Sequence, residues 1–317
     1  MTTRSAPRAE IGAFLDRLSA EGVLPLAELD VATARSEMRR SSLELWGEVE
    51  PVAEVAELTF PTGNGVEVRS YRPGPERRLP ALVYFHGGGW VVGGIETHDG
   101  LCRSLANAAQ CAVFSVGYRL APEHPFPAAA NDADAAAGWI HASADELGID
   151  TARMSVAGDS AGGNLAAVTA RRLARRGVRL ASQILVYPVT DGRTDTASYE
   201  ANSDGPYLTR ADMHWYLGHY ASDVSDLRDP DLAPLRAEDL SGLPPAYVAT
   251  AELDPLRDDG TAYAGRLRAA GVSVRLEDWP GTIHGFLLMR SVTPAADELI
   301  ATIVRFLGES WARPETP

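Results

Sequence analysis

The chain has 317 residues, of which 45% are hydrophobic, so it is long enough for one large domain with a substantial core. Its formal net charge of −14 argues against nucleic acid or an anionic membrane as a partner, because both would repel an acidic surface. All 29 basic residues are arginines, which excludes Schiff-base chemistry and other mechanisms that need a lysine.

Targeting and redox signals are weak in this sequence. The first ten residues are polar and charged, without the apolar segment of a secretory signal, and no stretch is long and apolar enough to span a membrane. Cys102 and Cys111 have neither Cys-x-x-Cys spacing nor partners for a disulfide framework, so we expect core thiols without a functional role. These features predict a cytoplasmic protein.

The first third of the chain predicts two helices and a hairpin. Apolar residues recur at helical spacing over 11–18, and a second helical stretch spans 25–40. The segments 55–60 and 66–71 follow, and the second of them alternates as a half-buried strand does. A glycine-rich turn at 62–65 should join them into an antiparallel hairpin.

From there strands and helices alternate, which predicts an α/β fold with a mostly parallel sheet of eight strands. The central predicted strands are Ala81 to Phe85, Ala112 to Val116, Arg153 to Ala157, Gln183 to Tyr187, Ala246 to Thr250 and Val272 to Leu276. The alternation stops between 191 and 240, where aromatic residues, aspartates and prolines replace the strand pattern. We therefore expect a main domain of residues 51–190 and 241–317, with residues 1–50 and the insertion 191–240 forming a helical cap.

The sequence predicts a reactive serine in a short turn between a strand and a helix. Gly158, Ser160 and Gly162 form a Gly-x-Ser-x-Gly pattern, in which glycines let the backbone pass through a tight corner. Such a nucleophile elbow exposes the serine hydroxyl at the tip of a sheet. The helix that begins there also favours negative charge at the same place.

A serine becomes a nucleophile only when a base removes its proton and an acid orients that base. In α/β-hydrolases the order along the chain is serine, then acid, then histidine. Of the seven histidines, His284 follows the last predicted strand in a glycine-flanked loop. Asp254 follows the preceding strand and is the favoured acid, and its competitors are Glu252, Asp258 and Asp259.

The third part of the predicted site is the run from His86 through three glycines to Trp90, directly after a buried strand. Consecutive glycines leave backbone N–H groups uncovered, and such donors can hold a tetrahedral oxyanion. His86 is expected to fix this loop by a hydrogen bond rather than to act as a base. Trp90 and Phe286 flank these motifs and are candidates for the substrate pocket, although packing in the core is the commoner role of such aromatics.

Five motifs in this order resemble the bacterial hormone-sensitive-lipase-like esterases with aspartate before the nucleophile. They are the His-Gly-Gly-Gly-Trp run at 86–90, the stretch 118–128, the elbow with its following residues 158–166, the segment 254–258 and the His-Gly-Phe run at 284–286. The resemblance implies an α/β-hydrolase fold with a helical cap, the triad Ser160, Asp254 and His284, and oxyanion donors on Gly88, Gly89 and Ala161. It also implies dimers paired through the last strand in some members.

The expected activity is hydrolysis of a short- to medium-chain acyl ester through an acyl-enzyme, with no metal or cofactor. Two alternatives stay open. The same triad could cleave an amide, acetyl or carbamate group, and the fold also hosts a plant hormone receptor that lacks the histidine. Within the stretch 118–128, Arg119 and Glu123 are expected to form a buried ion pair that holds the loop.

Overall fold

The computed structural model describes residues 6–59, 66–205 and 207–312. It begins with helix α1 (Ala9–Ala20), a 3-10 turn η1 (Leu26–Glu28) and helix α2 (Val31–Trp46). The second helix was expected over 25–40 but starts later, because the Asp30 side chain accepts the backbone N–H of Thr33 at 3.0 Å and caps it. It ends at Gly47, whose φ of 82° a β-carbon would disfavour.

The predicted eight-stranded sheet is confirmed. Its strands are β1 (Glu54–Thr59), β2 (Glu67–Arg72), β3 (Leu79–Phe85), β4 (Ala112–Gly117), β5 (Ile149–Asp159), β6 (Ser182–Val186), β7 (Ala246–Leu253) and β8 (Val274–Ile283). They lie side by side in the order β1-β2-β4-β3-β5-β6-β7-β8. The pairs β1–β2 and β2–β4 are antiparallel and the other pairs are parallel, which gives the expected mostly parallel sheet.

The predicted hairpin is confirmed by the pairing of β1 with β2, from Glu54 opposite Arg72 to Thr59 opposite Glu67. Its predicted turn at 62–65 lies outside the described residues. At the other end, β8 forms an edge of the sheet, and pairing of two copies there stays a prediction.

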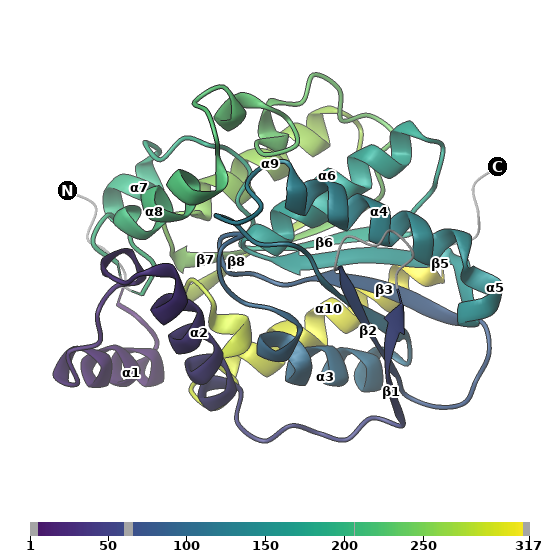
Figure 1. Ribbon diagram of the computed structural model, residues 1–317, viewed down its shortest axis with the longest axis horizontal. Helices are drawn as coiled ribbons and strands as arrows, with labels where there is room; N and C mark the ends of the chain where they lie inside the picture. The colour runs from purple at the N-terminus through teal and green to yellow at the C-terminus, as the bar shows by residue number, and fades with distance from the viewer. Residues whose placement is uncertain (1–5, 60–65, 206, 313–317) are drawn as a thin grey trace.

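Helices cover both faces of the sheet (Figure 1). On one face lie α4 (Ala128–Ala142), α6 (Ala161–Arg175) and α9 (Arg257–Ala269), and on the other lie α3 (Asp99–Ala109) and α10 (Ala295–Trp311); the short α5 (Ala144–Leu147) precedes β5. Strand β3 is buried along its whole length, as a continuous apolar run between two helix layers should be. Cys102 and Cys111 are buried free thiols, as expected. They belong to the apolar core that includes residues of α3 and α10.

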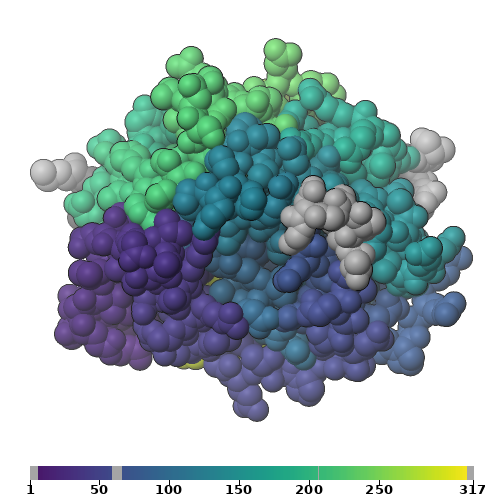
Figure 2. Space-filling model, in the orientation of Figure 1, coloured from purple at the N-terminus to yellow at the C-terminus, as the bar shows by residue number. Residues whose placement is uncertain are grey.

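The insertion 191–240 holds two helices, α7 (Ala197–Ala201) and α8 (Arg210–Tyr220), with the 3-10 turns η3 (Asp226–Arg228) and η4 (Pro234–Arg236). It touches the N-terminal segment, since the backbone N–H of Ala27 donates to Asp212 at 2.9 Å. Figure 2 shows the two segments, purple and green, adjoining at the surface. In the described part of the chain no helix has both the length and the apolar character needed to cross a membrane.

Candidate active site

The strand β5 and the helix α6 meet at Ser160, and the corner between them is as tight as the motif predicts. Ser160 has φ 55° and ψ −119°, a strained conformation that its N–H stabilises by donating to the Val186 carbonyl at 2.9 Å. A β-carbon on Gly158 would lie 2.2 Å from the Gly162 carbonyl oxygen, and one on Gly162 would lie 1.9 Å from the Phe85 carbonyl oxygen. The two glycines are therefore required by backbone contacts.

Three predicted side chains meet at this corner. Nε2 of His284 lies 3.0 Å from Oγ of Ser160, and Nδ1 of the same ring lies 2.7 Å from Oδ2 of Asp254. The other carboxylate oxygen of Asp254 accepts the Leu256 N–H at 2.8 Å, which fixes its orientation. Because the carboxylate can only accept, Nδ1 carries the ring proton, and Nε2 is left to take the proton of the serine hydroxyl.

The three competing carboxylates do not reach His284, because each is held by backbone N–H groups elsewhere. Glu252 accepts from Gly281 at 2.8 Å, and Asp258 accepts from Ser198 at 2.8 Å. Asp259 accepts from Thr190 and Asp191 at 2.9 and 3.0 Å. The structure thus places Asp254, and not its neighbours, beside the imidazole.

Asp259 gives a testable pH dependence of stability. Burial raises its pKa to about 8, against the effect of its two N–H donors. The unfolded chain would bind fewer protons than the folded one between about pH 4 and about pH 8, so the free energy of unfolding should fall as pH rises through this window. Asp259→Asn keeps an acceptor for both N–H groups and should raise the free energy of unfolding at about pH 8 by roughly 1–3 kcal/mol.

The measurement is urea unfolding of both proteins at about pH 5 and about pH 8. At the lower pH the difference between the two proteins should be smaller, because about pH 5 lies near the start of the window in which the folded chain binds the additional proton. Parallel pH dependences of the two proteins would show that Asp259 is not the responsible group.

The glycine run after β3 forms a turn above the elbow. Gly88 and Gly89 have φ values of 116° and 57°, and the Gly88 carbonyl accepts the N–H groups of Val91 and Val92 at 3.1 and 2.9 Å. In the described part of the chain no group accepts a hydrogen bond from the backbone N–H of Gly88, Gly89 or Ala161. These three predicted donors are therefore uncommitted.

Asp159, the residue before the nucleophile, ties the elbow to this turn. One of its carboxylate oxygens accepts from the Tyr84 hydroxyl at 2.8 Å and from the Gly87 N–H at 3.1 Å, and lies 3.1 Å from Nε2 of His98. Burial would raise the pKa of this carboxyl, but its interactions with His98 and Tyr84 lower it below its usual value. An ionised acceptor therefore stands beneath the first glycine of the turn.

His86 has the structural role that the sequence predicts. Burial and the neighbouring His98 lower the pKa of its imidazole to about 3, so the ring is neutral. Its Nδ1 lies 2.8 Å from the Gly87 carbonyl oxygen, and the ring stacks on Tyr118 with centroids 4.1 Å apart. It faces the loop backbone and not the Ser160 hydroxyl.

Trp90 and Phe286, the two aromatic candidates for the substrate pocket, lie in the packed core, and that they line the pocket stays a prediction. Both side chains are fully buried. Trp90, whose φ is 60°, stacks on Tyr220 of α8 with ring centroids 4.3 Å apart. Phe286 packs between Tyr187 and Trp279.

Two tyrosines that the sequence did not single out pack on the site. A β-carbon on Gly89 would lie 2.1 Å from the ring of Tyr216, so α8 rests directly on the glycine turn. The ring of Tyr187, at the end of β6, lies 4.7 Å from that of His284. The position of Tyr187 at a strand's carboxyl end was a usable signal, whereas nothing in the sequence of the insertion marks Tyr216.

The predicted ion pair between Arg119 and Glu123 is wrong. Arg119 donates to both carboxylate oxygens of Asp132 on α4, at 2.8 and 2.7 Å. Glu123 instead accepts from Arg35 of α2 at 2.8 and 2.6 Å. The physical reason is that Asp132 is buried beside Arg119, while the Glu123 side chain is turned outward and is 55% exposed.

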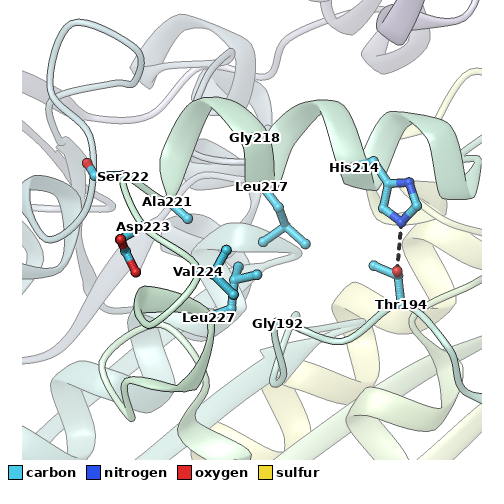
Figure 3. Close-up of a pocket in the computed structure, with 10 residues that line it drawn as sticks. All are labelled: Gly192, Thr194, His214, Leu217, Gly218, Ala221, Ser222, Asp223, Val224 and Leu227. Carbon is cyan, nitrogen blue, oxygen red and sulfur yellow. Dashed lines mark hydrogen bonds between the residues drawn. The ribbon is translucent and has the colours of Figure 1, made fainter.

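A cavity of about 550 Å³ is lined by residues of α8 and of the segments before and after it (Figure 3). Its walls are Gly192, Thr194, His214, Leu217, Gly218, Ala221, Ser222, Asp223, Val224 and Leu227. His214, one of the two histidines of the insertion, is hydrogen-bonded there to the Thr194 hydroxyl at 2.7 Å. No residue of this cavity belongs to the cluster around Ser160.

Comparison with known proteins agrees with this geometry. A family model described as the alpha/beta hydrolase fold matches residues 82–288, which hold the glycine turn, the elbow, Asp254 and His284. The chain belongs to this family. Its resemblance to the hormone-sensitive-lipase-like branch is confirmed by relatives that are 40–44% identical over nearly the whole chain.

Among these relatives of the α/β-hydrolase family is a carboxylesterase of Mycobacterium tuberculosis, 44% identical over 94% of this chain and 95% of that protein. Another is an ethyl acetate hydrolase of Pseudomonas putida, 40% identical over 91% of this chain and 93% of that protein. Among solved structures, a hyperthermophilic esterase from the archaeon Pyrobaculum calidifontis has a TM-score of 0.92 at 41% identity, covering 97% of this chain and all of that one.

Proposed function

We propose that this chain is a serine carboxylesterase that hydrolyses short- to medium-chain acyl esters through an acyl-enzyme. One observation carries the proposal. The imidazole of His284 connects the Ser160 hydroxyl to the Asp254 carboxylate, at 3.0 and 2.7 Å, below a turn with uncommitted N–H donors. This geometry serves acyl transfer, and relatives that match over more than nine-tenths of both chains are named a carboxylesterase and an ethyl acetate hydrolase.

The proposed reaction begins when Oγ of Ser160 attacks the ester carbonyl carbon and Nε2 of His284 takes the hydroxyl proton. Asp254 accepts a hydrogen bond from Nδ1 and stabilises the imidazolium that forms. The N–H groups of Gly88, Gly89 and Ala161 hold the negative oxygen of the tetrahedral intermediate. His284 then protonates the departing alcohol, and water activated by the same ring releases the acid and restores Ser160.

The proposed preference for short to medium acyl chains follows from the small space around the Ser160 and His284 side chains. Ser160 and His284 are each only 8% exposed. Tyr216 covers Gly89, and Tyr207 lies 3.4 Å from the position that a β-carbon on Gly285 would take. Both tyrosines belong to the insertion 191–240, so we propose that this insertion and residues 1–50 form the cap over the site.

The decisive experiment is labelling with a fluorophosphonate probe, which reacts only with an activated serine. We expect stoichiometric labelling of the protein and complete loss of labelling in Ser160→Ala. A small-molecule receptor, the alternative from another functional class, would bind ligands without being labelled. Substantial turnover of a short-chain p-nitrophenyl ester by the Ser160→Ala protein would sink the assignment.

The second alternative, hydrolysis of an amide, acetyl or carbamate group, shares the labelling result. It is separated by comparing kcat/KM for matched esters and amides that carry the same acyl group. A series of acyl chains from acetyl upward on the same protein then tests the proposed preference. We expect kcat/KM to decline for long chains, which the narrow site should exclude.

A further inference from the structure

One arginine of the N-terminal segment uses its whole guanidinium group to hold two buried loops. Nε of Arg35, on α2, donates to the Val91 carbonyl oxygen at 2.9 Å, and its Nη2 donates to the Ala121 carbonyl oxygen at 2.9 Å. Nη1 and Nη2 also donate to the two carboxylate oxygens of Glu123. Val91 and Ala121 are both fully buried, so Arg35 reaches into the interior from a surface helix.

The Val91 carbonyl belongs to the turn that carries the proposed oxyanion donors, and the Ala121 carbonyl belongs to a neighbouring loop that is bonded to this turn. The N–H of Val91 closes this turn by donating to the Gly88 carbonyl at 3.1 Å. The N–H of Ala121 donates to the Trp90 carbonyl at 2.9 Å. Arg35 therefore fixes the far side of the turn directly through Val91 and indirectly through Ala121.

The near side of the turn is held separately. Asp159 accepts the Gly87 N–H at 3.1 Å, and the Gly87 carbonyl oxygen lies 2.8 Å from Nδ1 of His86. Between these two anchors lie Gly88 and Gly89, whose φ values of 116° and 57° aim their N–H groups. Glycine backbones in such conformations move freely unless both flanks are fixed.

We propose that Arg35 is a positioning residue for the oxyanion hole: a side chain of α2, outside the site, sets the aim of the Gly88 and Gly89 N–H groups by holding the Val91 and Ala121 carbonyls. The inference rests on the proposed function, since it assigns a purpose to the uncommitted donors. It gives the N-terminal segment a role in the chemical step itself.

The contact with the carbonyls, and not the ion pair, carries the effect. The Arg35 and Glu123 side chains are 31% and 55% exposed, and ion pairs exposed to this degree are screened by water and contribute little. Without Arg35, in contrast, the buried Val91 carbonyl oxygen would lose its side-chain hydrogen-bond donor. The turn would then shift until this oxygen found another donor. Only the planar fork of arginine can reach two carbonyls and a carboxylate together, so lysine should be a partial substitute.

The test compares Arg35→Met, which keeps the length of the side chain but donates no hydrogen bond, with Arg35→Lys. We expect kcat per fluorophosphonate-titrated site to fall about tenfold in Arg35→Met with KM changed less than about twofold, since misplaced donors act on the transition state. Affinity for a trifluoromethyl ketone, whose adduct with Ser160 carries an oxyanion, should weaken by about the same factor. Arg35→Lys should recover part of both losses.

Two controls separate this role from a general loss of structure. Arg40→Met removes an arginine of the same helix that, among the residues the structure describes, pairs only with Glu37 and Glu44 on the surface, and it should leave kcat unchanged. Glu123→Gln removes the ion pair and should also stay near the wild-type kcat.

The proposal is overturned if Arg35→Met lowers only the melting temperature or the titratable fraction and leaves kcat per site intact. A loss in Glu123→Gln as large as that in Arg35→Met would overturn it as well, because the ion pair would then carry the effect. Failure of the proposed function is a different result, namely a wild-type protein that neither reacts with the probe nor hydrolyses esters.

Discussion

Replacing His284 with alanine should lower kcat for a short-chain ester by roughly 10⁴–10⁶, and replacing Ser160 with alanine should cost about as much. The reason is that the two side chains act as one unit: the hydroxyl, 3.0 Å from Nε2, is a nucleophile only while the imidazole can take its proton. The double variant should therefore be no slower than either single variant. Steady-state kinetics of the three proteins test this non-additivity.

Asp254→Asn should be less damaging, with kcat lowered by roughly 10³–10⁴, because the imidazole stays in place but loses the acceptor that selects its tautomer. The rate of fluorophosphonate labelling of Asp254→Asn should fall by a similar factor. Glu252→Gln serves as the matched control, since Glu252 lies near the end of strand β7, two residues before Asp254, but accepts the Gly281 N–H instead of contacting the ring. If Glu252→Gln were the slower of the two, the assignment of the acid would be wrong.

Gly162→Ala should destabilise the fold by at least about 3 kcal/mol and abolish labelling of Ser160. The added β-carbon would lie 1.9 Å from the Phe85 carbonyl oxygen and 2.6 Å from that of His86. Both obstacles are backbone atoms, so no side-chain rotation can relieve the contact. Helix α6 would have to move away from β3, and the nucleophile elbow would lose its geometry.

Gly265→Ala is the matched control for this variant. Gly265 also lies within a helix, α9, but a β-carbon there would meet nothing within 4 Å. Alanine should therefore stabilise the protein by about 0.5–1 kcal/mol through its better helix propensity. Urea unfolding of both variants measures the contrast, and equal stabilities would show that backbone packing at the elbow is less strict than the structure indicates.

The core of the fold could be predicted because it depends on short-range patterns. The apolar run of β3 and the alternation of strands with helices identify a mostly parallel sheet without any knowledge of contacts. Boundaries were less predictable, as α2 shows: a capping bond from Asp30 moved its start to Val31. Helix propensity is a property of several residues together and does not define a boundary. A single capping hydrogen bond can decide at which residue a helix begins.

The sequence positions of the aromatic residues near the motifs do not show which of their rings pack in the core and which cover the glycine turn. Trp90 stands next to the oxyanion glycines and Phe286 follows His284 by two residues, yet both rings are fully buried. The Trp90 ring stacks on Tyr220 of the insertion, a contact that the order of residues does not reveal. Tyr216, far away in the sequence, is the ring that covers Gly89.

The sequence by itself determined the nucleophile elbow, the glycine turn and the order serine, aspartate, histidine, because each follows from local backbone needs and chain order. Only the tertiary structure decided which charged side chains pair around the glycine turn, namely Asp132 with Arg119 and Arg35 with Glu123. Arg35 and Glu123 stand 88 positions apart and Ser160 and His284 stand 124 apart. Contacts between residues so far apart in the sequence depend on how the helices pack on the sheet, and local sequence patterns do not predict that packing.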